Sequence, residues 1–456
     1  MLCVGRLKPV TCGRLSRREL LRAGGLGVLG LSLGDLLKMQ ASGAGSPPRA
    51  KSIILLWLWG GPSHVDTFDM KPKAPIEYRG PYAPIATSVP GIEICELLPE
   101  TSRRAHQYSI IRSLCHESND HGVAGTIGLT GSSTGAKSLS GQTIPGQLLP
   151  SHGSVVSRVQ GFRAETPRFV TLGGFLHQGH LAINGEGGGS VGTVHDPFRL
   201  DYDPVQGVRI PQLQLAEGVT PNGLTARRQL LDEFDKLSGR IERSRTFEQF
   251  DEFYRRAFSL LTSPQSRQMF DLSEESEALR RRYGRFRFGQ CCLLARRLIE
   301  AGSRFVQVNW SSHVEPIEDT GDGGWDMHDR YFQQYQDRHA WMFDQSFSAL
   351  LDDLKDRGLL DETIVVAAGE FGRTPKINGK AGRDHWNDCY SAIVAGGGLR
   401  AGHVIGASDK HGERPVSNKC TPADLFATVL DQIGIGTTQL TTAGITPLGR
   451  TIEELL

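Results

Sequence analysis

The chain has 456 residues, a formal net charge of +1 and a charged fraction of 22%. This length and composition suit a globular protein with one large α/β domain or two smaller ones, and they exclude wholesale disorder. Because the net charge is close to zero and no block of like charge exceeds a few residues, we expect no nucleic acid as a partner.

The first 46 residues read as an export signal followed by a linker. Arg17 and Arg18 precede a short, glycine-diluted apolar run that starts at Ala23, and this pattern resembles a twin-arginine signal. The run is too short to span a bilayer as a helix, which takes about 20 residues. We therefore expect export to the periplasm or the cell exterior, with no transmembrane helix in the mature chain. A cytoplasmic amphipathic leader is the alternative.

A buried strand is predicted over residues 52–59, where an almost unbroken apolar run ends in two glycines. Such runs are typical of parallel strands that are covered on both faces. His64, Asp66 and Asp69 follow within a few residues, and imidazole and carboxylate ligands at this spacing can grip a divalent ion from one loop. The alternative is a turn in which Asp66 caps the next segment.

The next part of the chain alternates between helical and extended patterns. We predict a helix over 97–108, a strand over 108–114, a helix over 145–159 and a short strand over 168–172. Polar residues open a glycine-containing helix within 115–131. The first turn of that helix can hold an anion, or it is simply a capped helix with polar side chains.

Two longer segments differ from this alternation. Residues 174–220 are rich in glycine, proline and aspartate, which predicts a lid or a substrate-side insertion, and we interpret the histidines in it as solvent-exposed. Residues 225–301 are strongly helical and charged. Because acids are interspersed among the arginine runs of this second segment, a solvated helical face is favoured over nucleic-acid binding.

The strand pattern returns over residues 304–310. A glycine- and acid-rich loop follows it and ends in Asp326 and His328, which are two residues apart. The amphipathic pattern over 338–357 predicts a long helix, and a capped helix is predicted to end near residue 433. The Asp326/His328 pair repeats the residue types of the His/Asp loop after the first strand.

Two apolar runs, 363–369 and 392–398, read as buried strands of a parallel sheet. Glu370 follows the first run with Arg373 close behind, and an Asp-His pair at 384–385 precedes the second. Ligand sites in open α/β sheets collect outside the carboxyl ends of the strands, and ionisable residues are costly to bury unless they are paired or metal-bound. The alternative is a surface pair between Glu370 and Arg373.

Histidines and carboxylates at the ends of several strands suit zinc-like or manganese-like ions. Two such ions about 4 Å apart can clamp the attacking and leaving oxygens of a phosphate or sulfate ester. Arg373, Arg383 and Lys410 are then candidates for binding the anionic group. The residues therefore favour hydrolysis of phosphate or sulfate esters.

Four motifs stand behind the twin-arginine leader: Gly-Gly-Pro-Ser-His64-x-Asp66-x-Phe-Asp69, Gly-Trp-Asp326-x-His328, Gly-Glu370-Phe-Gly-Arg373-Thr-Pro and Asp384-His385-Trp. Together they resemble a large, mostly uncharacterised family of exported proteins. That family is numerous in planctomycete-type bacteria, is often loosely labelled sulfatase, and is placed in the alkaline phosphatase/sulfatase superfamily.

The resemblance implies an alkaline phosphatase-like α/β fold over residues 51–456, behind the leader of 1–46. This fold has a mostly parallel central sheet with helices on both faces and a helical insertion. It also implies divalent metal ions, two in number, of the zinc or manganese/calcium kind. The ligands of one ion are then Asp326, His328 and His385. The ligands of the other are Glu370 with Asp66 or His64, and Asp384 as a further candidate.

The nucleophile departs from the superfamily pattern, in which a Ser, Thr or formylglycine-forming Cys starts the helix after the second strand. Aligning the downstream Leu-Thr-Gly at 129–131 puts His121 at that position. No Cys-x-Pro-x-Arg occurs, so a formylglycine sulfatase is not expected. His121 is a candidate ligand, phosphoryl acceptor or general acid, and Thr126 is a second candidate nucleophile. Water activated by a metal is a further candidate.

Three functions stay open at this point. The first is a metal-dependent hydrolase that acts on a small-molecule or polysaccharide ester of phosphate or sulfate. The second is a non-catalytic relative that binds an anionic ligand or polysaccharide. The third is an exported protein in which the His/Asp clusters hold a structural metal.

Overall fold

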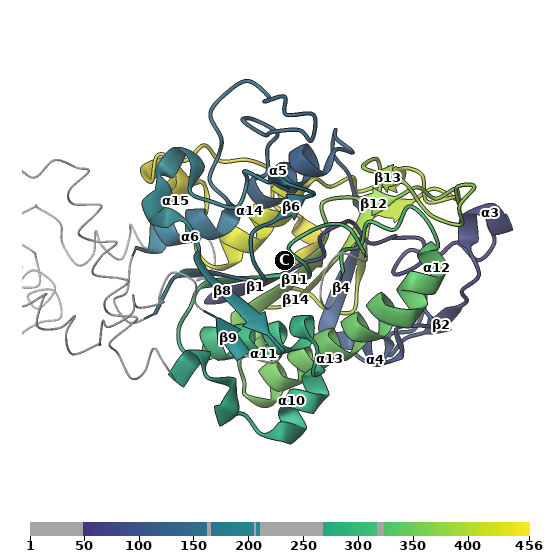
Figure 1. Cartoon of the computed structure of the whole chain (residues 1–456), viewed down its shortest axis with the longest axis horizontal. Helices are drawn as coiled ribbons and strands as arrows, with labels where there is room; N and C mark the ends of the chain where they lie inside the picture. The colour runs from purple at the N-terminus through teal and green to yellow at the C-terminus, as the bar shows by residue number, and fades with distance from the viewer. Residues whose placement is uncertain (1–48, 162–165, 205–206, 210–267, 317–322) are drawn as a thin grey trace, which may run out of the picture. The chain divides into compact units, whose positions relative to one another are not determined.

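The computed structural model describes residues 49–161, 166–204, 207–209, 268–316 and 323–456. A sheet of nine described strands lies at its centre (Figure 1). From one edge to the other these strands are β15 (Val404–Ile405), β4 (Tyr108–Leu114), β14 (Tyr390–Gly396), β11 (Thr363–Ala368), β1 (Ser52–Trp57), β10 (Phe305–Asn309), β5 (Phe169–Leu172), β8 (Phe198–Asp203) and β9 (Gly207–Arg209).

The sheet is mostly parallel. Strands β11, β1, β10, β5 and β8 each run parallel to the next one in that order, and β15 runs parallel to β4. Strand β14 is antiparallel to both β11 and β4, and β9 is antiparallel to β8. The carboxyl ends of β4, β11, β1 and β10 therefore lie at the same edge of the sheet.

The prediction that the runs at 363–369 and 392–398 are parallel strands is wrong in direction. A parallel connection needs a crossover, usually a helix. The segment between β11 and β14 instead forms a small antiparallel pair, β12 (Gly372–Arg373) with β13 (His385–Trp386). Because this segment stays at one edge, β14 starts beside the end of β4, with Tyr390 opposite Leu114.

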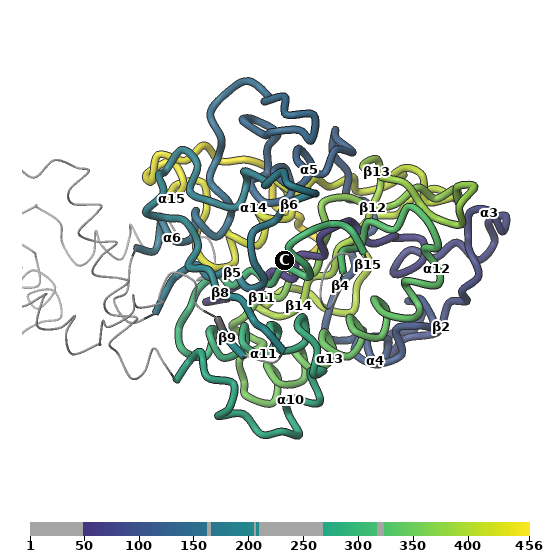
Figure 2. The backbone as a smooth tube through the Cα atoms, viewed as in Figure 1, coloured from purple at the N-terminus to yellow at the C-terminus, as the bar shows by residue number. Residues whose placement is uncertain are grey.

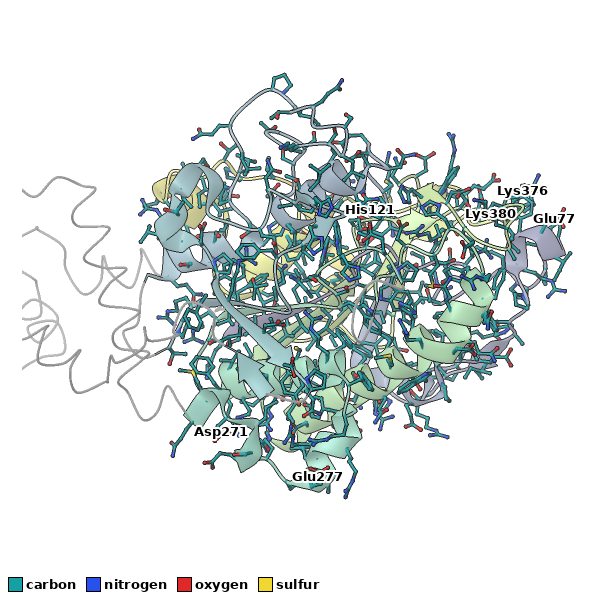
Figure 3. The ribbon with its side chains drawn as sticks, viewed as in Figure 1. Glu77, His121, Asp271, Glu277, Lys376 and Lys380 are labelled. Carbon is teal, nitrogen blue, oxygen red and sulfur yellow. The ribbon has the colours of Figure 1, made fainter. Side chains whose placement is uncertain are left out.

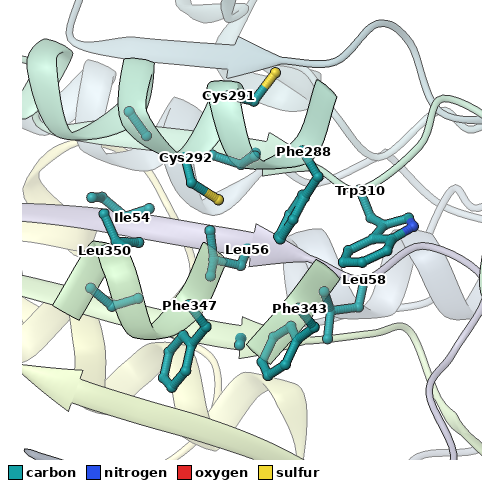
Figure 4. Close-up of a cluster of buried hydrophobic side chains, with 14 of the residues drawn as sticks. Ile54, Leu56, Leu58, Phe288, Cys291, Cys292, Trp310, Phe343, Phe347 and Leu350 are labelled. Carbon is teal, nitrogen blue, oxygen red and sulfur yellow. The ribbon is translucent and has the colours of Figure 1, made fainter. Parts of the chain in front are cut away.

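Helices cover both faces of the sheet because successive side chains of a buried strand point to opposite faces. Ile54, Leu56 and Leu58 pack into one core with α11 (Arg287–Glu300) and α13 (Ala340–Asp356) (Figure 4). The other face is covered by α5 (His121–Thr130), α6 (His152–Gln160) and α14 (Pro422–Gln432), and the β1 residues that pack there are Ile53, Leu55 and Trp57. The predicted α/β fold, with a mostly parallel sheet and helices on both faces, is confirmed.

Apart from α5, α6 and α14, the remaining helices and strands are short. The helices are α3 (Ile76–Arg79), α4 (Pro99–Ser102), α5 (His121–Thr130), α6 (His152–Gln160), α10 (Glu277–Tyr283), α12 (Tyr331–Gln334), α14 (Pro422–Gln432) and α15 (Thr437–Thr442). The strands outside the central sheet are β2 (Pro84–Ala86), β3 (Glu93–Cys95), β6 (His177–Gln178), β7 (Leu181–Ala182), β12, β13, β16 (Ala407–Ser408) and β17 (Pro415–Ser417).

Three predicted elements need correction. The helix expected over 97–108 consists of α4 and a separate 3-10 turn at Ala105–Gln107. The helix expected from residue 145 begins only at α6, because the Ser151 side chain caps it by accepting from the backbone N–H of Ser154. The segment expected as a lid from 174 contributes β8 to the central sheet.

Several predictions concern residues that the structure does not describe. The leader at 1–46 and most of the helical segment at 225–301 lie outside the described ranges, although α10 and α11 confirm helices near the end of that segment. None of the helices in the described ranges combines the length and the apolarity needed to cross a membrane.

Candidate metal centre

Side chains from four segments meet outside the carboxyl edge of the sheet. The backbone trace shows α5 beside the loops around β12 and β13 (Figure 2). The segments follow β4, β10 and β11 and precede β14. The side chains they contribute are His121, Asp326 with His328, Glu370 with Arg373, and His385. Because β14 is antiparallel to β11, a residue that precedes it reaches the same edge as residues that follow the other strands.

One carboxylate oxygen, Oδ1 of Asp326, is the centre of this group. The Nε2 atoms of His328, His385 and His121 lie 2.9, 3.0 and 3.3 Å from it. The Nε2 atoms of His328 and His385 are themselves only 3.0 Å apart. His121, Asp326 and His385 also meet the geometric requirements of a metal-binding group. His121, which is labelled in Figure 3, is fully buried.

The other nitrogen of each ring has an acceptor. Nδ1 of His121 lies 2.6 Å from Glu370 Oε1, and Nδ1 of His328 lies 2.8 Å from Asp384 Oδ1. Nδ1 of His385 lies 2.7 Å from the backbone carbonyl of Asn119. Nδ1 of His385 carries a proton, because it faces a backbone carbonyl, which only accepts. Both nitrogens of His121 and His328 face carboxylates, so a metal ion bound at Nε2 would leave the proton of each ring on Nδ1. The three Nε2 atoms then keep their lone pairs.

Three Nε2 atoms with lone pairs would then lie within 3.3 Å of Asp326 Oδ1, and positive charge among these atoms would stabilise the arrangement. Imidazole nitrogens and a carboxylate oxygen are the usual ligands of zinc, and an acceptor on Nδ1 orients a metal-binding histidine. The ligands of a tetrahedral ion with bonds of about 2.0–2.1 Å lie roughly 3.3 Å apart. The contacts of 2.9 to 3.3 Å around Asp326 Oδ1 are close to this separation.

The electrostatics of the group lead to the same conclusion. Burial raises the pKa of Asp326, but Arg373 and His121 outweigh that effect and hold it well below its usual range. Burial lowers the pKa of His121, but Asp326 and Glu370 outweigh it and raise the pKa to about 9. In His385, burial prevails and lowers the pKa to about 4. Without a metal ion, a proton on His121 supplies the positive charge that the two carboxylates attract.

Glu370 is fully buried and orients His121. The backbone N–H of Gly60 donates to both of its oxygens, at 3.0 and 3.2 Å. Gly60 has a φ of +106°, and a Cβ at this position would lie 2.5 Å from the backbone nitrogen of Trp325. Only glycine fits this turn, which follows β1 and packs against the backbone of Trp325 and Asp326.

Arg373 is also fully buried, and it faces protein groups. It donates to Asp326 Oδ1 at 2.6 Å, to the Gly61 carbonyl at 3.0 Å and to the Arg383 carbonyl at 3.2 Å. It also donates to the carbonyl of Gly60. From the sequence we expected this guanidinium to bind an anionic substrate group, whereas the structure places it against the carboxylate of Asp326.

The first predicted loop forms a separate group. Asp66 is fully buried and pairs with Arg383, with Arg383 Nε 2.6 Å from Oδ2 and Nη2 3.0 Å from Oδ1. His64 donates from Nε2 to the Gly412 carbonyl at 2.7 Å, and burial lowers its pKa. Asp384 contacts the outer nitrogen of His328. The three carboxylates that were predicted for a second ion, Asp66, Glu370 and Asp384, thus have different partners.

Thr126 lies farther along α5 than His121. Its hydroxyl donates to the Gly122 carbonyl at 2.8 Å and contacts Asn184 Oδ1 at 3.1 Å. The side chain is fully buried.

The sequence did not point to Gly60 and Asn119, which contribute to the centre through backbone groups. The two glycines after the first predicted strand could have indicated the role of Gly60. The role of Asn119 could not be predicted, because every residue type has a backbone carbonyl.

Comparisons with known proteins give a family and a set of distant structural likenesses. No curated protein matches the chain. It is similar to the PsFucS1 sulfatase from Pseudoalteromonas sp., with 14% identity, coverage of 91% of this chain and 73% of that chain, and a TM-score of 0.36. It is similar to the phosphonate monoester hydrolase SpPMH from Silicibacter pomeroyi, with 11% identity, coverage of 89% and 76%, and a TM-score of 0.37.

A third similar structure is the C-terminal periplasmic domain of EcEptC from Escherichia coli in complex with Zn. The identity is 10%, the coverage is 86% of this chain and 83% of that chain, and the TM-score is 0.34. In sequence, residues 50–453 match the model of a family described as protein of unknown function, DUF1501. Because this match spans nearly all of the chain behind the predicted leader, the chain belongs to the DUF1501 family.

Proposed function

We propose that this protein is a metal-dependent hydrolase of phosphate or sulfate esters. The observation that supports this most is the convergence of three imidazole Nε2 atoms on Asp326 Oδ1, at 2.9 to 3.3 Å. His121, His328, His385 and Asp326 would hold the ion. This nitrogen-rich set favours zinc or manganese over calcium, which prefers oxygen ligands.

The chain's own residues prepare the centre for this chemistry. A divalent ion bound there supplies Lewis acidity, which polarises an ester oxygen and activates water. Glu370 and the Asn119 carbonyl fix the rings of His121 and His385, and Arg373 fixes Asp326. The His328 side chain is 42% exposed, whereas that of His121 is fully buried. We expect the substrate to enter on the His328 side.

A second candidate is a protein that binds an anionic ligand or polysaccharide through the ion without turnover. One observation favours it: the candidate nucleophile Thr126 is fully buried and engaged with the Gly122 carbonyl. A structural metalloprotein is the third candidate. It predicts that the fold, rather than ligand binding, depends on the ion.

The remaining features of the proposal come from the sequence. We propose export by the twin-arginine route to the periplasm or cell exterior, membership of the alkaline phosphatase/sulfatase superfamily, and a small-molecule or polysaccharide ester as substrate. The motif set and the paired arginines at 17–18 support these points. We propose no nucleic acid as a partner.

The test is a measurement of metal content and turnover on the purified full chain. Protein reconstituted with Zn²⁺ or Mn²⁺ is assayed on an aryl phosphate, an aryl phosphodiester and an aryl sulfate, beside Asp326→Ala. Asp329→Asn, a change at an exposed acid three residues away, is the matched control. We expect turnover that needs the ion and that is lost in Asp326→Ala but retained in the control. Metal binding without turnover of any ester supports the binding protein instead.

A further inference from the structure

We infer that the metal centre holds a single divalent ion, and that the buried guanidinium of Arg373 supplies the remaining positive charge. The inference rests on the metal site of the proposed function and adds to it the number of ions and the role of Arg373. Two independent observations support it, namely the charge balance at the centre and the partners of the carboxylates that a second ion needs.

The first observation is the charge balance. Three carboxylates contact the imidazoles of the centre: Asp326, Glu370 and Asp384. They carry three negative charges, since the imidazoles are neutral when each Nε2 keeps its lone pair. Arg373 contributes one positive charge and one divalent ion contributes two, so the total is zero. A second divalent ion would leave two uncompensated positive charges beside His121 and Glu370, which are fully buried although Asp384 is 52% exposed, and uncompensated charge at buried groups is costly.

The second observation is that the carboxylates assigned to a second ion are already engaged. Asp66 is paired with Arg383 and accepts from the Ser63 hydroxyl at 2.6 Å. Glu370 accepts from the Gly60 N–H and from His121. Each of these fully buried carboxylates thus has donors of its own, and the Asp66 charge is neutralised by an arginine rather than by a metal.

The geometry of Arg373 fits a fixed cation. Its side chain is fully buried on β12, and its donors reach Asp326 and the carbonyls of Gly60, Gly61 and Arg383. Swinging the guanidinium toward a substrate would break these hydrogen bonds and leave the Asp326 charge unpaired. Arg373 is therefore a positioning residue that holds and neutralises Asp326.

The number of ions tests the inference directly. The full chain is stripped with a chelator, titrated with Zn²⁺ by calorimetry, and analysed by elemental mass spectrometry. We expect one ion per chain, and none in Asp326→Asn. Two ions per chain in the wild type, or one ion retained in Asp326→Asn, would overturn the inference while leaving a metal protein. Absence of any ion in the wild type would instead remove the proposed function.

The charge role of Arg373 needs a separate comparison, because loss of this side chain also disturbs Asp326. Glu370→Gln leaves one excess positive charge in the loaded centre, and we expect Zn²⁺ affinity to fall at least tenfold. Adding Arg373→Gln restores the balance, so the double variant should bind Zn²⁺ more tightly than Glu370→Gln alone. If Arg373 only positions Asp326 and its charge does not matter, the double variant should bind Zn²⁺ more weakly than Glu370→Gln alone, and that order would overturn the charge role. Thermal unfolding of both variants confirms that they are folded.

Discussion

Nδ1 of His121 lies 2.6 Å from Oε1 of Glu370, and both side chains are completely buried. The pair joins the start of α5 to the end of β11, two elements that are far apart in the sequence. By holding the proton of His121 on Nδ1, Glu370 leaves Nε2 free to face Asp326 at 3.3 Å. Glu370 is not among the four residues that we propose as metal ligands, but its contact with Nδ1 leaves Nε2 of His121 available to a metal ion.

Replacing this glutamate tests that role without a change in size. We expect Glu370→Gln to weaken Zn²⁺ binding by about 10- to 100-fold, because the change weakens the contact that orients His121 and also removes one negative charge from the centre. Competition with a chromogenic chelator measures the affinity. Glu77→Gln is the control, because Glu77 is exposed at the margin of the molecule (Figure 3). An unchanged affinity in Glu370→Gln would contradict the orienting role.

The turn after β1 is expected to be sensitive to a single methyl group. Gly60→Ala puts a Cβ 2.5 Å from the Trp325 nitrogen at a φ of +106°, so we expect a loss of more than about 3 kcal/mol in the free energy of unfolding. Gly91→Ala is the matched control, with a φ of +84° and no atom within 4 Å of the new Cβ. It should cost only about 1 kcal/mol. Urea unfolding measures both, and equal losses would refute the clash.

Metal binding should also stabilise the fold. An ion that binds only the folded chain raises the free energy of unfolding by about 2.7 kcal/mol at a concentration 100 times its dissociation constant. We expect this gain in the wild type, as a Zn²⁺-dependent rise in the unfolding midpoint, and its loss in Asp326→Asn. A chain that unfolds completely when the metal is removed would favour the structural metalloprotein instead.

Sequence reasoning located the buried strands and most of the centre, for a physical reason. Apolar runs such as 52–59 mark strands covered on both faces, and ionisable residues that directly follow parallel strands lie at the same edge of the sheet. This pattern predicts that the Asp326/His328 pair lies near Glu370, whereas the grouping of His385 with Asp326 and His328 around one ion is what the family resemblance implies. The direction of β14 was missed because its apolar run reads the same in a parallel and an antiparallel strand.

The partners of the buried carboxylates could not be predicted from the sequence, for a different reason. Asp66 and Asp326 stand in similar His/Asp motifs, but each is matched to a different arginine by the tertiary fold. Arg383 contacts Asp66 and Arg373 contacts Asp326, both at 2.6 Å. Residue type and spacing indicate that a carboxylate needs a positive partner, whereas the choice between a metal and an arginine depends on contacts between distant segments.

Removing only one member of the Asp66–Arg383 pair should strongly lower the free energy of unfolding. Both side chains are fully buried, so Arg383→Met leaves an unpaired buried carboxylate, and we expect a loss of about 3–5 kcal/mol in the free energy of unfolding. The double variant Asp66→Asn with Arg383→Met removes the orphan charge and should recover part of that loss. A double variant less stable than Arg383→Met alone would contradict this account. Denaturant unfolding in the absence of metal measures both.

The burial of His152, a residue outside the metal centre, leads to a prediction of how the stability of the protein depends on pH. Its ring is buried and stacks on Phe426 with centroids 3.7 Å apart, and burial lowers its pKa to about 3. The unfolded chain binds this proton near pH 6.5, whereas the folded chain does not. Stability from His152 is therefore fully present above pH 6.5 and is lost as the pH falls toward 3, by an amount on the order of 4 kcal/mol.

Two substitutions distinguish the effect of His152 titration on stability from the effect of its packing against Phe426. His152→Gln removes the ionisable group, so we expect lower stability at pH 7.5 but a smaller decline between pH 7 and 4 than in the wild type. Phe426→Leu removes the stacked ring but keeps the histidine buried, so it should lower stability at both pH values and retain the decline. Denaturant unfolding of metal-free protein across this range measures the slopes. Equal slopes in His152→Gln and the wild type would show that the acid sensitivity arises elsewhere, because a group that no longer titrates cannot link proton binding to unfolding.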